Sequence, residues 1–336
     1  MGMRLSTELV QALTRLKMDI LMFPRFQRAY EKILDSIELY ERAGVAENFQ
    51  LLGPSGCGKS TLCALLLSKF PMRIEPERTV VPVLYAQVPA LATIHALAGS
   101  LLRGLNDPAP TRGTTDEKAA RLCLVAKGCG VRLIMLDEVQ HVIDRGQSLT
   151  ITRTADWIKS LESNIEFPII LVGLSRAKVL LDANEQLRRR FSASLHLDQF
   201  DFSKDDDVIE FAGLVASFLE AMPIKCDLKP ESYDDLRMLH NATDGRVGYL
   251  AKLFMRALMI ACESRERKIK RSLLAQAFIE AVWSDGVGER NPFSTNFHGR
   301  QLIERGEPFY EDVIVKPAVR WQSRSSGGIS ANKVPV

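Results

Sequence analysis

The stretch that decides the fold reads Gly53-Pro54-Ser55-Gly56-Cys57-Gly58-Lys59-Ser60-Thr61, and it follows the spacing G-x-x-x-x-G-K-[ST]. It lies between a predicted strand, 48–52, and a predicted helix, 60–70. Glycines at these positions let backbone N–H groups curl around a phosphate, and the N-terminus of the following helix favours anions. Lys59 would neutralise the β- and γ-phosphates of a nucleoside triphosphate, and the Ser60 hydroxyl would bind Mg²⁺. The whole stretch is therefore predicted to bind ATP with Mg²⁺.

A second stretch, Arg132-Leu133-Ile134-Met135-Leu136-Asp137-Glu138, is an apolar strand that ends in two acids. Asp137 could hold the Mg²⁺ ion, and Glu138 could orient and activate the attacking water. A kinase that transfers phosphate to a bound hydroxyl does not need the second acid, whereas a hydrolase does. The pair therefore favours an ATPase with Glu138 as its catalytic base. The alternative is an acidic strand end exposed to solvent.

Three more candidates for the nucleotide site follow along the chain. Ser175 comes directly after an apolar strand, 168–174, and its hydroxyl could contact the γ-phosphate or could belong to a plain turn. In Leu187-Arg188-Arg189-Arg190-Phe191, an arginine could reach the γ-phosphate of a neighbouring subunit, or the run could be a basic surface turn. In Asp244-Gly245-Arg246-Val247-Gly248, Arg246 could close over the phosphates, or it could be an exposed arginine at a helix start.

Composition excludes several classes of protein. The formal net charge of this 336-residue chain is +3, which excludes a histone-like polycation. The longest apolar runs, such as 168–174, are far shorter than the ~20 residues of a membrane span, and the N-terminus lacks the apolar core of a signal peptide. The cysteines are scattered without a CxxC pair. We therefore expect a cytoplasmic protein with no membrane partner.

The pattern of apolar residues predicts an α/β half followed by an all-helical half. Strands separated by helices up to residue 202 predict a parallel sheet covered by helices on both faces. From Ser203, which with Asp206 is predicted to start a helix, helices run to about residue 283 with no strand between them. The predicted domains are an N-terminal extension, 1–24; a nucleotide-binding domain, 25–202; a helical lid, 203–285; and a C-terminal extension, 286–336. The extension is predicted to bind a partner and to end in a disordered basic tail, 320–336.

Two predicted loops have the chemistry of a DNA contact, which needs Lys, Arg and small hydroxyl residues aimed at phosphates. They are 109–115 and 145–150, the second together with Arg153, and the alternative is a pair of ordinary surface loops. The basic run 265–271 is instead predicted to be a solvated helix face. The candidate DNA-binding residues are Thr111, Arg112, Thr114, Arg145, Thr150 and Arg153.

The phosphate-binding loop comes first along the chain, followed by the strand with two acids, Ser175, the arginine run and the helical lid with Arg246. Features in this order resemble an AAA+ ATPase module over about 23–283. Within that superfamily the sequence most resembles the TniB/TnsC-type regulators of DNA transposition. The residues that carry the narrower likeness are Asp137-Glu138-Val139-Gln140-His141, Asp156-Trp157-Ile158-Lys159, Pro168-Ile169-Ile170-Leu171-Val172-Gly173, Glu185-Gln186-Leu187-x-x-Arg190-Phe191 and Asn291-Pro292-Phe293.

The resemblance implies an ATP-dependent protein that oligomerises on double-stranded DNA as a ring or helical filament, marks the target site and recruits a DDE-type transposase. ATP hydrolysis then remodels or disassembles the polymer. Guide-directed relatives, which belong to CRISPR-associated transposons, receive the target from a TniQ-type adaptor bound to a CRISPR effector. By this resemblance, Ser175 maps to sensor 1, Arg189 or Arg190 to the arginine finger, and Arg246 to sensor 2.

Three other functions share parts of this pattern. A helicase loader or replication initiator of the AAA+ type would share every residue of the nucleotide site. A signalling scaffold switched by nucleotide would assemble without DNA, and Glu138 weighs against it. A small-molecule kinase is disfavoured by the second acid and by the helical lid.

Overall fold

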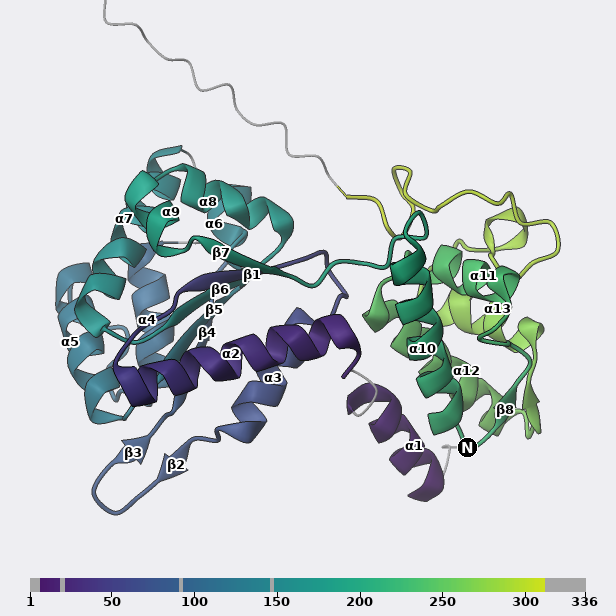
Figure 1. Ribbon diagram of the computed structural model, residues 1–336, viewed down its shortest axis with the longest axis horizontal. Helices are drawn as coiled ribbons and strands as arrows, with labels where there is room; N and C mark the ends of the chain where they lie inside the picture. The colour runs from purple at the N-terminus through teal and green to yellow at the C-terminus, as the bar shows by residue number, and fades with distance from the viewer. Residues whose placement is uncertain (1–6, 19–21, 91–92, 146–147, 312–336) are drawn as a thin grey trace, which may run out of the picture.

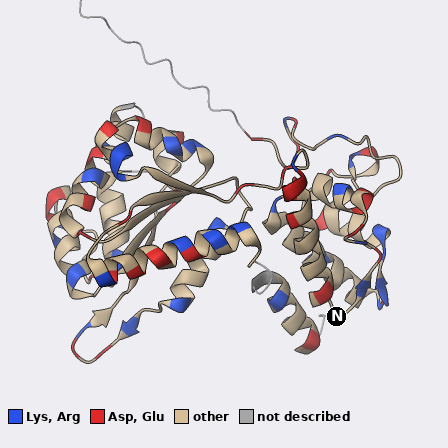
Figure 2. Cartoon of the chain, in the orientation of Figure 1, with Lys and Arg blue, Asp and Glu red and all other residues tan. Residues whose placement is uncertain are grey.

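The computed structural model describes residues 7–18, 22–90, 93–145 and 148–311 (Figure 1). The predicted tail at 320–336 lies outside the described residues. Within the described ranges, no helix has the length and apolar character needed to cross a membrane. Lys and Arg are interspersed with Asp and Glu over both halves of the molecule (Figure 2), in keeping with the small net charge.

A five-stranded parallel sheet forms the centre of the first half, as predicted. Its order is β4 (Val83–Gln87), β5 (Leu133–Asp137), β6 (Ile169–Gly173), β1 (Phe49–Leu52) and β7 (Ala193–His196). Every residue of β1, β5 and β6 is buried, which is why these strands appear in the sequence as continuous apolar runs. Because the strands are parallel, the segments that follow β1, β5 and β6 meet at one edge of the sheet.

Helices cover both faces of this sheet (Figure 1). Successive side chains of a strand point to opposite faces, so each strand contributes to two cores. Leu133 and Met135 belong to the core under α2 (Pro24–Ala43) and α3 (Lys59–Lys69). Ile134 and Leu136 belong to the core under the opposite layer. That layer consists of α4 (Ile94–Gly104), α5 (Thr115–Gly128) and α7 (Ser148–Ile165).

The second half consists of α10 (Asp205–Ala221), α11 (Tyr233–Thr243), α12 (Val247–Glu263) and α13 (Arg271–Ala281). Helix α1 (Thr7–Met18) packs against α10 and α12.

Two expectations for this half were wrong. A short parallel pair, β8 (Lys225–Cys226) with β9 (Lys268–Ile269), lies where no strand was expected. The run 265–271 is not a helix face, because Ile269 is fully buried in β9 and α13 begins only at Arg271.

Three local expectations also differ from the structure. The stretch 79–88, whose Val and Tyr residues predict a single strand, forms two strands. They are β3 (Thr79–Val80) and β4, on either side of Pro82, which has no N–H to donate to a ladder. Ser203 does not cap α10: its hydroxyl donates to Asp201 Oδ1 at 2.7 Å, and α10 begins after Lys204. Strand β7 was not predicted, because a short edge strand with alternating exposure lacks an apolar run.

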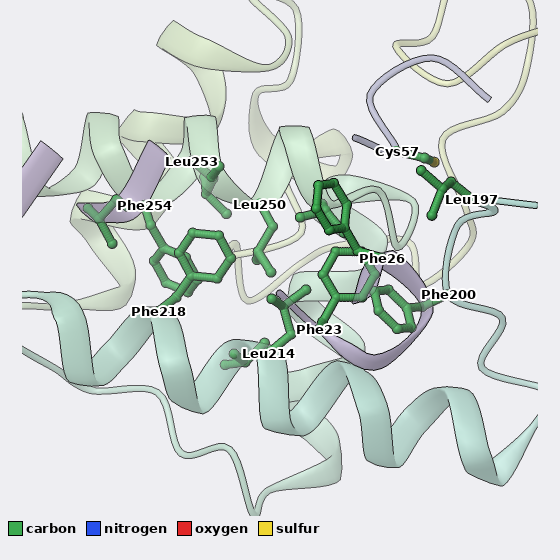
Figure 3. Close-up of a cluster of buried hydrophobic side chains, with 14 of the residues drawn as sticks. Phe23, Phe26, Cys57, Leu197, Phe200, Leu214, Phe218, Leu250, Leu253 and Phe254 are labelled. Atoms are coloured by element: carbon green, nitrogen blue, oxygen red, sulfur yellow. The ribbon is translucent and has the colours of Figure 1, made fainter. Parts of the chain in front are cut away.

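One hydrophobic core joins the two halves next to the phosphate-binding loop (Figure 3). Cys57 of the loop and Leu197 after β7 lie at one end of the cluster, and Phe218 of α10 with Phe254 of α12 lie at the other. Arg25 of α2 adds a polar link: its guanidinium pairs with two acids of α10 and lies 4.1 Å from the centre of the Phe200 ring. The helical half is therefore held against the loop.

Candidate nucleotide site

The loop between β1 and α3 needs glycine at three positions. Gly56 and Gly58 have φ angles of 82° and 98°, which L-residues with side chains rarely adopt. A Cβ on Gly53 would lie 2.0 Å from the carbonyl oxygen of Leu197, so the two backbones could not approach as they do. Cys57 points into the core, where burial raises its pKa to about 12. The thiol is therefore neutral and serves packing.

Lys59 is fixed inside this loop. Its Nζ donates to the carbonyl oxygens of Gly53 and Pro54, each at 2.7 Å, and the residue is only 9% exposed. Burial lowers its pKa, while the nearby carboxylates of Asp137 and Glu138 act in the opposite direction. Ser60 and Thr61 follow in the first turn of α3, and Ser60 is exposed. A buried cation, a loop of glycines and a helix start in one place fit the polyphosphate of ATP.

Asp137 ends β5 with both carboxylate oxygens engaged. Oδ2 accepts from the Tyr85 hydroxyl at 2.8 Å, and Oδ1 accepts from the Glu138 N–H at 2.8 Å. Burial is the main cause of a raised Asp137 pKa, which these hydrogen bonds oppose. Tyr85, whose own pKa is raised by burial and by Asp137, was not predicted as a site residue. An oriented carboxylate of this kind suits Mg²⁺, a cation that prefers oxygen ligands.

Glu138 is held in an unusual backbone conformation. Its φ is 59°, a left-handed value that is uncommon for glutamate and often marks a functional position. Gln140 donates from Nε2 to the Glu138 carboxylate, while its Oε1 accepts from the Leu174 N–H at 3.1 Å. Gln140 is buried, and Ser175, which follows Leu174, is exposed at the end of β6. Gln140 thus links Glu138 to the backbone of Leu174, the residue before Ser175.

Arg246 reaches the loop from the start of α12. Its side chain is 6% exposed, so it is not the solvent-exposed arginine of the alternative interpretation. Nη1 donates to the Ser55 carbonyl oxygen at 3.4 Å, and the Gly248 N–H donates to the Gly56 carbonyl oxygen at 2.7 Å. The first turn of α12 therefore lies directly on the phosphate-binding loop.

The two arginines predicted as finger candidates differ in their contacts. Arg190, the last residue of α9 (Glu185–Arg190), pairs with Glu162 and donates to the Ser163 hydroxyl at 2.5 Å, both on α7. Arg189 is exposed, and the described part of the chain offers it no hydrogen-bond or ion-pair partner. Arg190 thus fixes α9 on α7, and Arg189 is free to contact another molecule.

The candidate DNA residues lie at the starts of two neighbouring helices. Thr114 caps α5, and Arg112 in the preceding loop is exposed. Thr150 and Arg153 lie on α7, so the prediction of a loop that extends to residue 150 was wrong. The side chain of Arg145 lies outside the described residues. Helices α5 and α7 pack together, and each leads into a strand at the amino edge of the sheet. Their starts therefore lie toward the carboxyl edge, on the side of the phosphate-binding loop.

The family model described as Bacterial TniB protein matches residues 13–201, which is more than half of the chain. This chain belongs to the TniB family. No curated protein matches the sequence of this TniB-family member.

Solved structures of similar fold include a Cdc6p and two ORC proteins. Cdc6p from Pyrobaculum aerophilum is 15% identical, with a TM-score of 0.58 over 80% of this chain and 69% of that one. ORC1 from Aeropyrum pernix, solved in complex with DNA, is 17% identical, with a TM-score of 0.54 over 77% of this chain and 64% of that one. ORC2 from the same organism is 16% identical, with a TM-score of 0.51 over 76% of this chain and 66% of that one. At these identities the likeness shows the fold alone, which is that of the predicted AAA+ module.

Proposed function

We propose that this TniB-family protein is an ATP-dependent regulator of DNA transposition. It oligomerises on double-stranded DNA, marks the target site and recruits the transposase, and ATP hydrolysis disassembles the oligomer. The observation that carries the proposal is the meeting of Lys59, Asp137, Glu138 and Arg246 around one phosphate-binding loop in a chain of this family.

Each residue of the site has a role in this proposal. Lys59 and the loop N–H groups bind the β- and γ-phosphates, and Ser60 with Asp137 holds Mg²⁺, which neutralises phosphate charge when bound. Glu138 accepts a proton from the attacking water, and its link to Gln140 fixes the direction of its carboxylate. Ser175 and Arg246 sense the γ-phosphate from the end of β6 and from the lid.

The proposal also includes the predicted domain boundaries and a role for the C-terminal extension. The nucleotide-binding domain is 25–202 and the helical lid is 203–285. The C-terminal extension, 286–336, contacts the transposase or a TniQ-type adaptor. Residues 291–311 pack on the lid through buried side chains such as Phe293 and Leu302, so the described part of the extension is joined to the lid.

DNA binding has a direct test. The double variant Arg112→Ala with Arg153→Ala is expected to weaken binding to a labelled duplex about 10-fold or more in fluorescence anisotropy with an ATP analogue. Each lost phosphate contact removes favourable charge interaction, and the slope of affinity against salt falls by about 1 per contact. Arg267→Ala, an exposed arginine of the helical half, is the matched control. Unchanged affinity and slope would remove these helix starts from the DNA interface.

The proposed role of Arg189 as the arginine finger can be tested by mixing two variants of the protein. Arg189→Ala is expected to lower ATP turnover about 100-fold, because a cation that stabilises transition-state charge is lost. Mixing this variant with Glu138→Gln subunits should restore part of the turnover, since an intact Glu138 then meets an intact Arg189 across an interface. If no mixing ratio restores hydrolysis, Arg189 does not act between subunits.

A replication initiator or helicase loader is the second candidate, because Cdc6p and ORC1 have a similar fold. The two functions differ in the protein that the DNA-bound oligomer captures. Co-sedimentation with a purified DDE-type transposase supports the first, and co-sedimentation with a replicative helicase alone supports the second.

A further inference from the structure

The C-terminal segment 302–311 lies beside the phosphate-binding loop, through residues that the reaction proposed above does not use. Phe309 is buried, and its ring packs edge-on against Tyr249 of α12 with the ring centroids 5.2 Å apart. The Tyr249 ring lies against the loop, since a Cβ built on Gly56 would be 3.3 Å from it. Phe309 and Tyr249 therefore form a continuous contact from the segment to the loop.

Glu311 makes a second connection, to Arg246. Its Oε1 accepts from Arg246 Nη2 at 3.1 Å, next to Asp244, whose Oδ2 accepts from Nε at 3.1 Å and forms an ion pair with Nη2 at 3.0 Å. Nη1 donates to the Ser55 carbonyl oxygen. The two carboxylates thus occupy the Nε and Nη2 side of the Arg246 guanidinium, and an anion that binds at Nη2 must displace one of them.

The two carboxylates differ in how easily they can leave Arg246. The side chain of Asp244 is 7% exposed, so without Arg246 it would be a buried charge without its partner, which is strongly unfavourable. The side chain of Glu311 is 58% exposed and can return to water at little cost. An anion that binds at Nη2 of Arg246 will therefore displace Glu311 and leave Asp244 in place.

We propose that Glu311 and the γ-phosphate of a nucleoside triphosphate compete for Arg246, so that triphosphate binding releases the end of segment 302–311. The inference rests on the proposed function, because it requires Arg246 to face the γ-phosphate. By linkage, Glu311 weakens triphosphate binding by the same factor with which the triphosphate weakens the Glu311 contact. A diphosphate lacks the competing group and leaves Glu311 on Arg246. Nucleotide state then sets how firmly the C-terminal end of the chain is tethered to the lid.

The first measurement compares Glu311→Ala with wild type in the full-length chain, by titration with fluorescently labelled ATP and ADP in Mg²⁺. Removing the competing carboxylate is expected to tighten ATP binding about 2- to 5-fold, the range of a partly exposed ion pair, and to leave ADP binding unchanged. Glu304→Ala is the matched control, because Glu304 lies in the same segment and pairs with Arg300 instead. Equal effects on ATP and ADP, or no effect on either, would overturn the proposal.

The second measurement is amide hydrogen exchange of wild type across 302–311. Residues near 311 are expected to exchange faster with a non-hydrolysable ATP analogue than with ADP, and equal exchange would count against the proposal. Deleting the segment is unsuitable as a test, because Leu302 and Phe309 are buried. If labelled ATP binds with no difference between the variants, only this inference fails. If it binds to none of them, the proposed function fails with it.

Discussion

Replacing Lys59 by alanine is expected to abolish specific ATP binding, and with it assembly on DNA. The ammonium group is buried inside the loop that would hold the phosphates. Removing one partner from a buried charge pair typically costs about 2–5 kcal/mol, so the Kd for ATP should rise by about 30-fold or more. Isothermal titration with Mg²⁺ and a non-hydrolysable analogue measures the change.

The control for Lys59→Ala comes from the same helix. Lys69 is exposed at the other end of α3, so Lys69→Ala should keep wild-type affinity. Thermal unfolding of both variants checks that the loop remains folded, because Lys59 also donates to the Gly53 and Pro54 carbonyl oxygens. Wild-type ATP affinity in a folded Lys59→Ala protein would contradict the phosphate-binding role of this loop.

The variant Glu138→Gln is expected to bind ATP normally and to hydrolyse it about 10²- to 10⁴-fold more slowly, the contribution of a general base. Glutamine keeps an oxygen that can accept from Gln140, so the local structure should survive. It has no carboxylate to take the proton from water. Single-turnover release of phosphate measures the loss, and oligomers formed with ATP should persist on DNA.

The matched control for Glu138→Gln is Glu166→Gln. Glu166 also has a left-handed backbone, with φ of 63°, but it precedes β6 at the opposite edge of the sheet. The same change of charge on the same type of backbone should leave turnover unchanged there. Wild-type turnover in Glu138→Gln would exclude Glu138 as the base.

The parts of the candidate site that could be predicted from the sequence belong to local motifs. The spacing from Gly53 to Thr61 contains both the loop and the helix start, and a buried strand that ends in two acids needs no partner to be recognised. The parallel sheet brings these segments to one edge as expected.

Other residues of the site depend on contacts between distant segments. Tyr85 reaches Asp137 only because β4 pairs with β5, and Glu311 reaches Arg246 only because the C-terminal segment folds back over α12. Gln140 lies inside a quoted motif, but its bond to the Leu174 N–H becomes visible only once β5 and β6 are side by side. Strand β7 alternates between exposed and partly buried residues, and the strands of the β8–β9 pair are short. None of these strands contains an apolar run, so the pattern of apolar residues did not predict them.

In the proposed function, ATP controls assembly on DNA through this site. Electron microscopy of the purified protein with double-stranded DNA, comparing a non-hydrolysable ATP analogue with ADP, tests this control. We expect rings or filaments on DNA with the analogue and none with ADP. Particles that form with the analogue but do not bind DNA would contradict the proposed control of DNA assembly by ATP. They would indicate a scaffold switched by nucleotide.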